Sequence, residues 1–331
     1  MLLKNNSSPF FSVIIPVYNK APHISRSVYS VLNQDFDNFE LLIINDASTD
    51  DSLSIINNFT DKRIRLFNRH VPGPGGYAAR NLGIKNSYGK WIAFLDADDE
   101  WYNNHLLELY NLILLYKNIK IVTTSWKTID PNIDSEFINS FCETHSYLEH
   151  KIITNYEYLV NSYKKCTPFW TGVISIKKSV LMKIRGFPED KFKRGGDTDT
   201  WLRAIFYCKY SAWSSKITAI YYRDSINMVS NSYPSTGLCE KQTVKRLLYI
   251  ENDKKIKLAL KKFANLKILN GSTRAILNGF TLSKKTYFNL YFFVLEPKQI
   301  FLFLILFIFP NNLFKLSFKI YFKIKNLLFV K

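Results

Sequence analysis

The stretch Trp91-Ile-Ala-Phe-Leu-Asp-Ala-Asp-Asp-Glu-Trp101 decides the fold, because an apolar run ends there in four acidic residues. Such a run is typical of a strand buried within a sheet. Carboxylates crowded in a partly dehydrated crevice raise one another's pKa values unless a cation lies among them. Ligands of α/β sheets bind beyond the carboxyl ends of strands, so the pattern indicates a divalent metal that holds a phosphorylated substrate. The ordinary alternative is a solvated turn, the commoner meaning of an isolated Asp-x-Asp.

Strand-like and helix-like segments alternate before this stretch. Apolar, β-branched runs predict strands over residues 10–17, 39–45, 63–68 and 91–95. Helical spacing predicts helices over residues 21–34, over residues 77–86 and from near Asp51 onwards. Ser48 or Thr49 is expected to cap the helix near Asp51. This alternation implies a mostly parallel, Rossmann-like α/β sheet with right-handed crossovers and flanking helices.

Polar side chains collect where these predicted strands and loops end. They are Asn19, Asp46, Ser48, Arg80, Asp96, Asp98 and Asp99. Because the carboxyl ends of parallel strands meet at one edge of a sheet, we expect these side chains to converge on one crevice. That convergence favours a ligand site over a solvated turn.

The chain after Trp101 is less regular. We expect helices over residues 106–116 and 178–185, strands over 119–126 and 170–176, and a polar stretch without a predicted element over 130–150. Asp197 or Asp199 is expected to cap or begin a further helix that carries Trp201.

The composition argues for a folded chain with reduced thiols. Hydrophobic residues make up 47% and aromatic residues 16% of the 331 residues, which argues against disorder. The four cysteines have no Cys-x-x-Cys spacing, as expected of a cytosolic chain, and the five histidines show no paired zinc-ligand spacing. Residues 1–9 are short and polar and lack the apolar core of a signal peptide.

The net charge of +18 is concentrated at the end of the chain. Residues 254–331 hold fifteen Lys and Arg against a single acid, Glu296, a net charge of +14 that leaves +4 for the first 253 residues. A nucleic-acid-binding protein would spread its basic residues over the folded body, so this placement argues against such a partner.

The basic segment is also intensely apolar. Residues 287–295 and 300–309 are two apolar runs, each shorter than the roughly 20 residues of a spanning helix. Residues 313–330 carry lysines every four positions, which predicts an amphipathic helix with a basic face. These features predict a membrane-associated helical tail, peripheral or monotopic, at the anionic cytoplasmic face of the inner membrane. The alternative is that the tail packs onto the catalytic domain or a partner subunit.

Five motifs together resemble the large family-2 glycosyltransferases. They are Phe11–Lys20 (FSVIIPVYNK), Glu40–Ser52 (ELLIINDASTDDS), Gly76–Ile84 (GYAARNLGI), Trp91–Trp101 (WIAFLDADDEW) and Gly195–Arg203 (GGDTDTWLR). Each motif alone is weak, but five in the family's order argue against chance. The resemblance covers residues 10–225 and implies the nucleotide-diphospho-sugar transferase fold known as GT-A.

The resemblance implies a role for each matched position. The positions that would bind the donor are Pro16, Val17, Asn19, Asp46, Arg80, Asp96 and Asp98. The first three would line the nucleotide base, Asp46 would hydrogen-bond it, with uracil the usual base, and Arg80 would contact the nucleotide side of the donor. Asp98 would ligate Mg²⁺ or Mn²⁺, either alone or with Asp96 or Asp99.

Asp197 matches the last acid of the family's Glu-Asp motif and would be the catalytic base. The acid that usually precedes it is Gly196 here, which departs from the family pattern. Asp199 could be mistaken for the base, but two steps along a helix place side chains on different faces, so only one of the two should point into the site. Alignment to Trp201 favours Asp197. Trp126, Trp170 and Trp201 are expected in the core, with stacking on sugars as the alternative.

The implied activity is inverting sugar transfer from a nucleotide-diphosphate donor, a UDP-sugar first of all, to a hydroxyl of a lipid-linked glycan. The implied setting is bacterial cell-surface polysaccharide or lipopolysaccharide synthesis, such as O-antigen or capsule. The alternatives are a polyprenyl-phosphate sugar synthase and a membrane adaptor on an inactive transferase fold. The predicted parts are an extension (1–9), a nucleotide-sugar-binding half (10–125), an acceptor half with the base (126–225), a basic helical linker (226–285) and the tail (286–331).

Overall fold

The computed structural model describes residues 8–130, 134–189, 192–225 and 236–308. The chain divides into two compact units, the first Met1–Phe192 with Gly196–Asn227 and the second Lys193–Gly195 with Met228–Lys331. The five-part division expected from the sequence stays a prediction. Among the described residues, no helix has both the length and the apolar character that crossing a membrane requires.

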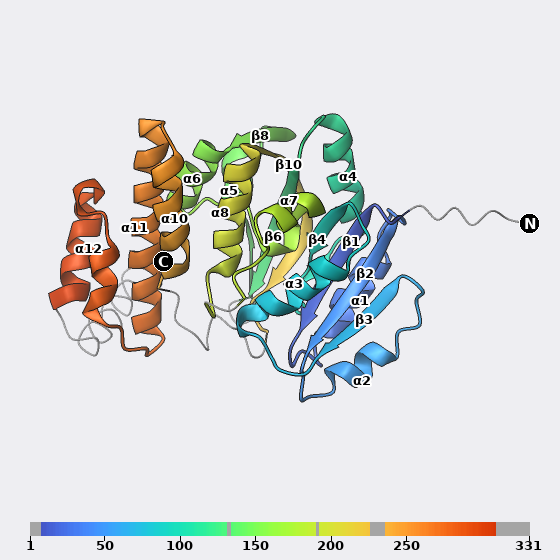
Figure 1. Cartoon of the computed structure of the whole chain (residues 1–331). Coiled ribbons are helices and arrows are strands. Elements are labelled where there is room, and N and C mark those ends of the chain that lie inside the picture. Colours follow the sequence, from blue (N-terminus) through green and yellow to red (C-terminus); the bar gives the residue numbers. More distant parts are fainter. Residues whose placement is uncertain (1–7, 131–133, 190–191, 226–235, 309–331) are drawn as a thin grey trace, which may run out of the picture. The chain divides into compact units, whose positions relative to one another are not determined.

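Short strands and helices alternate through the first unit (Figure 1). The strands are β1 (Phe11–Val17), β2 (Phe39–Asp46), β3 (Ile64–Arg69), β4 (Trp91–Phe94), β5 (Glu100–Trp101), β6 (Ile121–Asp130), β7 (Ser135–Ile138), β8 (His150–Thr154), β9 (Ile174–Lys177) and β10 (Tyr210–Tyr222). The α-helices are α1 (Ile24–Leu32), α2 (Ser52–Asn57), α3 (Tyr77–Asn86), α4 (His105–Leu115), α5 (Ser140–His145), α6 (Asn155–Tyr163), α7 (Lys178–Lys183) and α8 (Gly196–Cys208). Two 3₁₀ turns, η1 (Pro74–Gly76) and η2 (Thr171–Val173), complete the unit.

The sheet is mixed, so the expectation of a mostly parallel sheet is only partly met: the first four strands are parallel, β6 and β10 also pair in parallel, and the other pairs are antiparallel. The strand order is β3-β2-β1-β4-β9-β6-β10-β5, with β7 beside β6 and β8 beside β10. The first four strands are parallel, as strand–helix–strand crossovers require. By contrast, β9 runs antiparallel between β4 and β6. It follows an irregular segment and η2, so no crossover helix fixes its direction.

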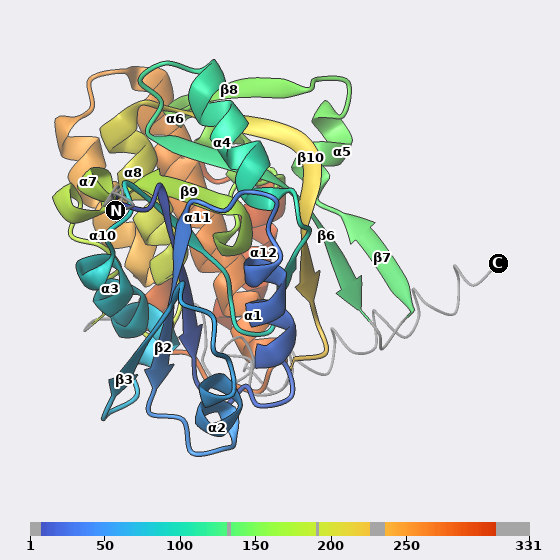
Figure 2. The same cartoon turned by 90° about the vertical axis from the view of Figure 1, so that its right-hand side faces the viewer.

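Helices cover both faces of the parallel strands, as Figure 2 shows for α1 and α3 on either side of β1 and β2. Alternate residues of β1 serve the two faces, because successive strand side chains point in opposite directions. Val13 and Ile15 join a core cluster with side chains of α1 and α4. Ile14 faces α3, where a Cβ on Gly83 would lie 2.7 Å from Ile14 Cγ2. Gly83 therefore allows the helix to approach the sheet closely.

Three local expectations from the sequence were wrong. The helix α2 has Asp51 as its N-cap, with no side-chain cap hydrogen bond, so neither Ser48 nor Thr49 caps it. The expected strand over residues 170–176 begins only after the 3₁₀ turn η2. The polar stretch 130–150 contains β7 and α5, two short elements whose residues lack a clear hydrophobic period.

The second unit is helical. Its elements are α10 (Leu238–Ile250), α11 (Lys254–Leu277), η3 (Lys284–Asn289), η4 (Phe292–Val294) and α12 (Pro297–Ile308). A small core joins α11 to η3 and α12, and its buried members are Ile268, Leu269, Ile276, Tyr287, Leu290 and Leu306. Asn265 of α11 both donates to and accepts from the backbone of Tyr291, at 2.9 and 2.8 Å, and so anchors the segment between η3 and η4.

The apolar run expected to dip into a membrane therefore has one face packed on protein. That protein is α11 of the same unit. The predicted basic helix over residues 313–330 lies outside the described residues. Membrane attachment of the tail stays a prediction.

Candidate active site

The acidic end of β4 is matched by cations from other elements. Arg80 of α3, only 7% exposed, forms an ion pair with Asp96 and donates a hydrogen bond to the Gly75 carbonyl oxygen at 3.0 Å. Burial raises the pKa of Asp96, and the nearby Asp98 and Asp197 carboxylates add to the shift while Arg80 opposes it. A buried carboxylate of this kind is stable as an anion only with its cation in place.

Asp98 lies at the centre of a second set of contacts. Its Oδ2 accepts a hydrogen bond from Lys20 Nζ at 2.7 Å and another from Ser225 Oγ. Arg26 of α1 donates to the Asp98 carbonyl oxygen at 2.5 Å. Burial alone would raise the pKa of Asp98, but Lys20 and Ser225 outweigh it and hold the pKa below its ordinary value. Asp98 is therefore an anion at neutral pH.

Asp99 differs from its two neighbours in being fully buried. Its Oδ1 accepts a hydrogen bond from the Tyr222 backbone at 3.1 Å, and its Oδ2 has no hydrogen-bond partner. Burial, together with the charges of Asp98 and Asp96, raises the pKa of Asp99 well above its ordinary value. Because Asp99 is fully buried and its Oδ1 is occupied by the Tyr222 backbone, the geometry favours Asp96 and Asp98 over Asp99 as metal ligands.

Asp46 ends β2 at the same edge of the sheet. Its side chain forms an ion pair with Arg69, the last residue of β3, and accepts a hydrogen bond from the Gly73 backbone at 3.1 Å. Asp46 is 2% exposed, and this burial raises its pKa although Gly73 and Arg69 oppose the shift. Gly73 lies just before the Gly/Pro turn η1, so Asp46 connects that turn to the sheet.

Asn19 joins the loops that follow β1 and β2. Its backbone N–H donates to Ser48 Oγ at 3.1 Å, and its Oδ1 accepts from the Thr49 backbone at 2.8 Å. Asn19 and Ala47 both have a positive φ, 51° and 58°, a backbone conformation that is strained for alanine and better tolerated by asparagine. The sharp turns at these strand ends bring the two loops together.

Pro16 and Val17 stand at the end of β1, beside the loops joined by Asn19. Val17 is fully buried, so its side chain belongs to the core and only its backbone can line a ligand. Pro16 is partly exposed and lies near Gly76, where an added Cβ would be 3.7 Å from Pro16 Cβ. The end of β1 and the start of α3 therefore lie next to each other.

The two candidate bases of α8 differ in their surroundings. The Asp197 carboxylate is close enough to shift the pKa values of both Arg80 and Asp96. Asp199 is buried and accepts a hydrogen bond from Arg203 Nε at 2.8 Å, one helical turn along. Asp199 is therefore held in a structural ion pair, and Asp197 as the catalytic base stays a prediction.

The packing around position 196 explains why glycine stands there, where the family usually has an acid. The Gly196 backbone N–H donates to Tyr77 Oη at 2.9 Å, and an added Cβ would lie 2.7 Å from the Tyr77 ring. The close approach of α3 and α8 leaves no room for a side chain there. This contact fixes the first turn of α8, and with it Asp197, against the helix that carries Arg80.

Several residues of the site were missed by the sequence reading. Arg69 could have been found, because it ends β3 at the same edge as Asp46. Lys20 stands inside a quoted motif, but nothing local shows that it reaches Asp98, 78 positions away. Ser225 lies 127 positions from Asp98 and had no sequence signal at all.

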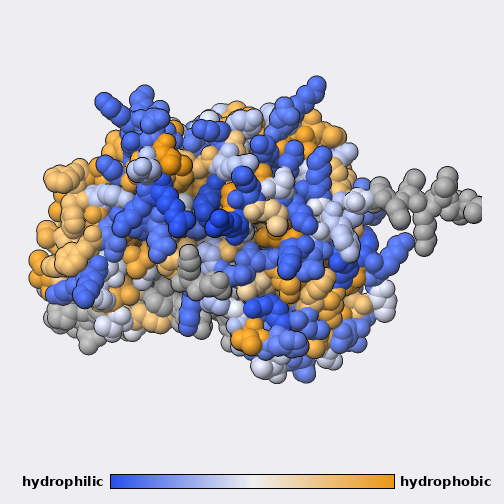
Figure 3. All heavy atoms as spheres, in the orientation of Figure 1, coloured by the Kyte–Doolittle hydropathy of each residue, from blue (hydrophilic) through white to orange (hydrophobic). Residues whose placement is uncertain are grey.

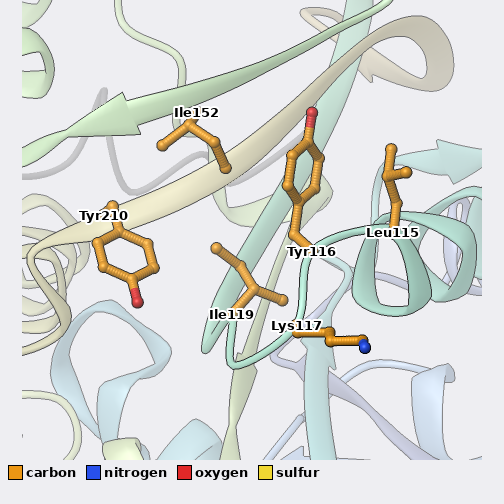
Figure 4. Close-up of a pocket in the computed structure, with 6 residues that line it drawn as sticks. All are labelled: Leu115, Tyr116, Lys117, Ile119, Ile152 and Tyr210. Atoms are coloured by element: carbon orange, nitrogen blue, oxygen red, sulfur yellow. The ribbon is translucent and has the colours of Figure 1, made fainter.

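A pocket elsewhere in the first unit lacks the chemistry of this site. It has a volume of about 500 Å³ and is lined by Leu115, Tyr116, Lys117, Ile119, Ile152 and Tyr210 (Figure 4). It lies where β6 and β10 begin, whereas the acidic cluster lies where the parallel strands end. Its lining contains no carboxylate to hold a metal or accept a proton.

The donor set of the acidic edge suits a hard divalent cation. Asp96 and Asp98 offer carboxylate oxygens, the ligands that Mg²⁺ and Mn²⁺ prefer, and the Lys20 ammonium group already occupies a cation position beside Asp98. Within the described ranges, no group of three or more His, Cys, Asp and Glu is arranged to hold a metal. Magnesium sites that serve phosphates often use only one or two carboxylates and complete the shell with substrate oxygens.

A family model also matches this chain. The model of glycosyl transferase family 2 matches residues 12–184, more than half of the chain. The chain belongs to glycosyl transferase family 2. The match includes Asp46, Arg80 and the acidic end of β4, and it ends before α8.

Named relatives of this family 2 chain include one with a described substrate. Over 145 residues it is 35% identical to the Escherichia coli UDP-Glc:alpha-D-GlcNAc-diphosphoundecaprenol beta-1,3-glucosyltransferase WfgD, which covers 44% of this chain and 55% of WfgD. Over 120 residues it is 48% identical to an uncharacterized glycosyltransferase of Rickettsia bellii, covering 36% of this chain and 17% of that protein. The chain spans less than two thirds of the length of these relatives.

Two solved structures share the fold. S. aureus TarS 1-349 in complex with UDP-GlcNAc has a TM-score of 0.67, with 18% identity and 90% of each chain covered. The mannosyltransferase PcManGT from Pyrobaculum calidifontis, in complex with GDP-Man and Mn²⁺, has a TM-score of 0.54, with 15% identity, covering 94% of this chain and 88% of that one. At this identity the likeness shows the fold alone, which is the GT-A fold expected from the sequence.

Proposed function

We propose that this family 2 protein is an inverting glycosyltransferase that moves a sugar from a UDP-sugar to a hydroxyl of a lipid-linked glycan. The observation that supports the proposal is the convergence of Arg80, Asp96 and Asp98 on one strand edge, with Gly196, the residue before Asp197, held against α3 by its hydrogen bond to Tyr77. The Asp197 carboxylate would then face a group of acids and cations suited to a diphosphate. We further propose that the glycan belongs to a bacterial cell-surface polysaccharide or lipopolysaccharide, such as O-antigen or capsule.

The chain's own residues can divide the reaction between them. Asp197 accepts the proton of the acceptor hydroxyl, whose oxygen attacks the anomeric carbon as the bond to the diphosphate breaks. Attack from the face opposite the leaving group inverts the anomeric centre. Arg80 and Lys20 are cations within reach of the leaving diphosphate, and such preorganised charges stabilise the transition state. A Mg²⁺ or Mn²⁺ ion on Asp98, with Asp96 beside it, would supply further charge to the leaving diphosphate.

The choice of UDP rests on Asp46 and on the relatives. Asp46 is held rigidly by Arg69 and Gly73 at the end of β2, where a fixed carboxylate can read the N–H of a uracil. WfgD is named for a UDP-Glc donor, and TarS was solved with UDP-GlcNAc. PcManGT was solved with GDP-Man and Mn²⁺, so the same fold also accepts a purine nucleotide.

The glycan acceptor is supported by aromatic side chains beside the acids. Trp126, Trp170 and Tyr221 form a row with ring centroids 5.5 and 5.4 Å apart. Tyr221 directly precedes Tyr222, whose backbone N–H donates to Asp99 Oδ1 at 3.1 Å, so the row ends close to the acidic residues. Aromatic faces favour sugar rings over a bare lipid phosphate. Trp126, at 9% exposure, and Trp201, at 3%, are core residues, as expected, so the partly exposed Trp170 and Tyr221 are the members of the row open to a sugar.

Nucleotide binding and donor hydrolysis test the proposal. Unfolding midpoints are measured with UDP, GDP or dTDP, each with Mn²⁺ or with EDTA. We expect UDP with Mn²⁺ to raise the midpoint more than either component alone, because the metal and diphosphate complete each other's coordination. Slow hydrolysis of a UDP-sugar should accompany binding. No response to any nucleotide diphosphate would favour the adaptor alternative, and transfer to polyprenyl phosphate alone would favour the synthase.

A further inference from the structure

We propose that the second unit docks on an anionic membrane surface through the outer face of α12. This outer face consists of exposed apolar side chains of α12, η3 and η4. Its members are Phe288, Phe292, Phe293, Ile300, Phe301, Leu304 and Ile308. Figure 3 shows hydrophobic residues gathered at the molecular surface over α12.

The spacing of the α12 residues makes this face continuous. Ile300, Phe301, Leu304 and Ile308 recur at intervals of one, three and four residues, so they form one stripe along the helix. Phe301 is 67% and Ile308 61% exposed, and Phe293 of the adjoining η4 is fully exposed. Scattered surface hydrophobics need no explanation, but a contiguous stripe of this kind marks an interaction site.

The inner face of the same helix is already used. Leu306 is 2% exposed, and the Phe303 and Phe307 rings lie 6.1 and 6.4 Å from that of Tyr287. Because the inner face of α12 packs against α11 and η3, the exposure of the outer face does not result from poor packing of the helix. A helix that is apolar on both sides and buried on only one has a free side to offer a partner.

The charge around the outer face identifies the partner as anionic. Residues 254–308 hold ten Lys and Arg against one acid, Glu296, and that acid is paired with Lys262 at 3.1 Å. Lys284, Lys285 and Lys298 are exposed on η3 and at the start of α12, and Lys284 Nζ lies 5.2 Å from the Phe307 ring. Phenylalanines that enter an interface between lysines are typical of helices that lie on anionic lipid.

A second copy of the chain is a weaker partner for this face. Pairing two outer faces would bring two strongly basic surfaces together, and like charges at close range repel. Anionic headgroups instead attract the lysines while the acyl region accepts the phenylalanines. The inference does not rest on the proposed transferase activity, although docking here would keep the enzyme near a lipid-linked acceptor.

Vesicle flotation of the full chain tests this inference. We expect binding to phosphatidylcholine vesicles that contain phosphatidylglycerol, and little binding to phosphatidylcholine alone. The double variant F293S/F301S should weaken binding by at least about tenfold, because each phenylalanine loses its burial in the lipid. K284Q/K285Q should weaken it by about fivefold for each lysine and make the remainder less sensitive to salt.

A matched control uses exposed apolar side chains elsewhere in the same unit. Tyr249 and Ile250 of α10 are 91% and 70% exposed, and Y249S/I250S should bind vesicles like the unaltered chain. Equal binding of F293S/F301S and the unaltered chain would overturn the inference, as would equal binding to neutral vesicles. Dimerisation that F293S/F301S abolishes, without lipid binding, would replace the membrane by a second copy. UDP-sugar hydrolysis by all variants separates failure of docking from failure of the proposed function.

Discussion

The acidic edge of the first unit and the outer face of α12 are both exceptions to the usual distribution of side chains, in which charged groups are exposed to water and large apolar groups are buried. At the acidic edge, the charged groups Asp96, Asp98 and Arg80 are largely withdrawn from water. On the outer face, large apolar groups such as Phe293 and Phe301 remain in water. Each arrangement costs stability by itself, and each becomes favourable when a suitable partner arrives.

The two regions differ in how their cost is offset before any partner binds. Asp46, Asp96 and Asp98 each have a cation supplied by another element, so this part of the site is preorganised. The outer face of α12 has only the rim of lysines around it. Ligand binding at the acidic edge should therefore depend on the position of individual atoms. Docking through the outer face of α12 should depend on total apolar area and charge.

Asp197→Asn should have the largest effect of any change considered. It keeps the shape of the carboxylate but removes the proton acceptor, so we expect kcat to fall by about 10² to 10⁴-fold with donor affinity nearly unchanged. Initial rates and UDP binding by calorimetry measure the two quantities. Asp199→Asn is the matched control, since it breaks an ion pair with Arg203 and should cost stability while leaving kcat within a few-fold. Near-normal turnover of the Asp197 variant would show that the base is elsewhere.

Asp98→Asn should remove the metal dependence of donor binding. The amide cannot replace an anionic ligand, and it also loses the ion pair with Lys20, so the Mn²⁺-dependent gain in UDP affinity should fall by about tenfold or more. Titration of UDP with Mn²⁺ and with EDTA measures this gain. Asp37→Asn, at a side chain 93% exposed, is the control and should leave it intact. An unchanged Mn²⁺ effect would mean that the acidic edge is a structural ion-pair network.

Leu306→Ala and Phe301→Ala separate the two faces of α12. Leu306 is buried, so its truncation should cost about 2–5 kcal/mol of unfolding free energy, whereas exposed Phe301 should change it by less than about 0.5 kcal/mol. Urea unfolding followed by far-ultraviolet circular dichroism measures both. Comparable losses for the two variants would mean that Phe301 is packed in solution and that no free outer face exists.

The sequence predicted the parallel half of the fold and most of the acidic edge for the same physical reason. Because β1, β2 and β4 are parallel, their carboxyl ends lie at one edge of the sheet, so Asp46 and Asp96 were expected at that edge once their strands were recognised. Helical periodicity likewise predicted that only one of Asp197 and Asp199 points into the site, and the alignment to Trp201 favoured Asp197.

The contacts that the sequence did not reveal join residues that have no periodic relation. The hydrogen bond from Ser225 to Asp98 and the antiparallel direction of β9 both depend on the place in the fold to which long irregular segments lead the chain back. The seating of α12 on α11 was missed because α12 is apolar all round, so its hydrophobic pattern could not show which face is buried. In all three cases tertiary packing decided among arrangements that local sequence left equivalent.

Acidification should destabilise the first unit through His105, a buried group that lies away from the acidic edge. His105 is fully buried, with its ring stacked 4.1 Å from that of Trp101, Nδ1 2.7 Å from Thr218 Oγ1 and Nε2 without a hydrogen-bond partner. Burial lowers its pKa to about 3. A histidine in an unfolded chain has a pKa near 6.5. Below that pH the imidazole of His105 is protonated in the unfolded chain but stays neutral in the folded chain. Stability should fall from about pH 6.5 downward, by roughly 2 kcal/mol at pH 5.

Tryptophan fluorescence can measure this effect on the first unit alone. All five histidines and all six tryptophans lie within Met1–Phe192 and Gly196–Asn227, so neither the titration nor the signal belongs to the unit that contains α12. Urea unfolding between pH 7 and 5 should show the expected slope, and His70→Gln, at an exposed loop position, should keep it. An imidazole of His105 that titrates near pH 6.5 by NMR would contradict its burial.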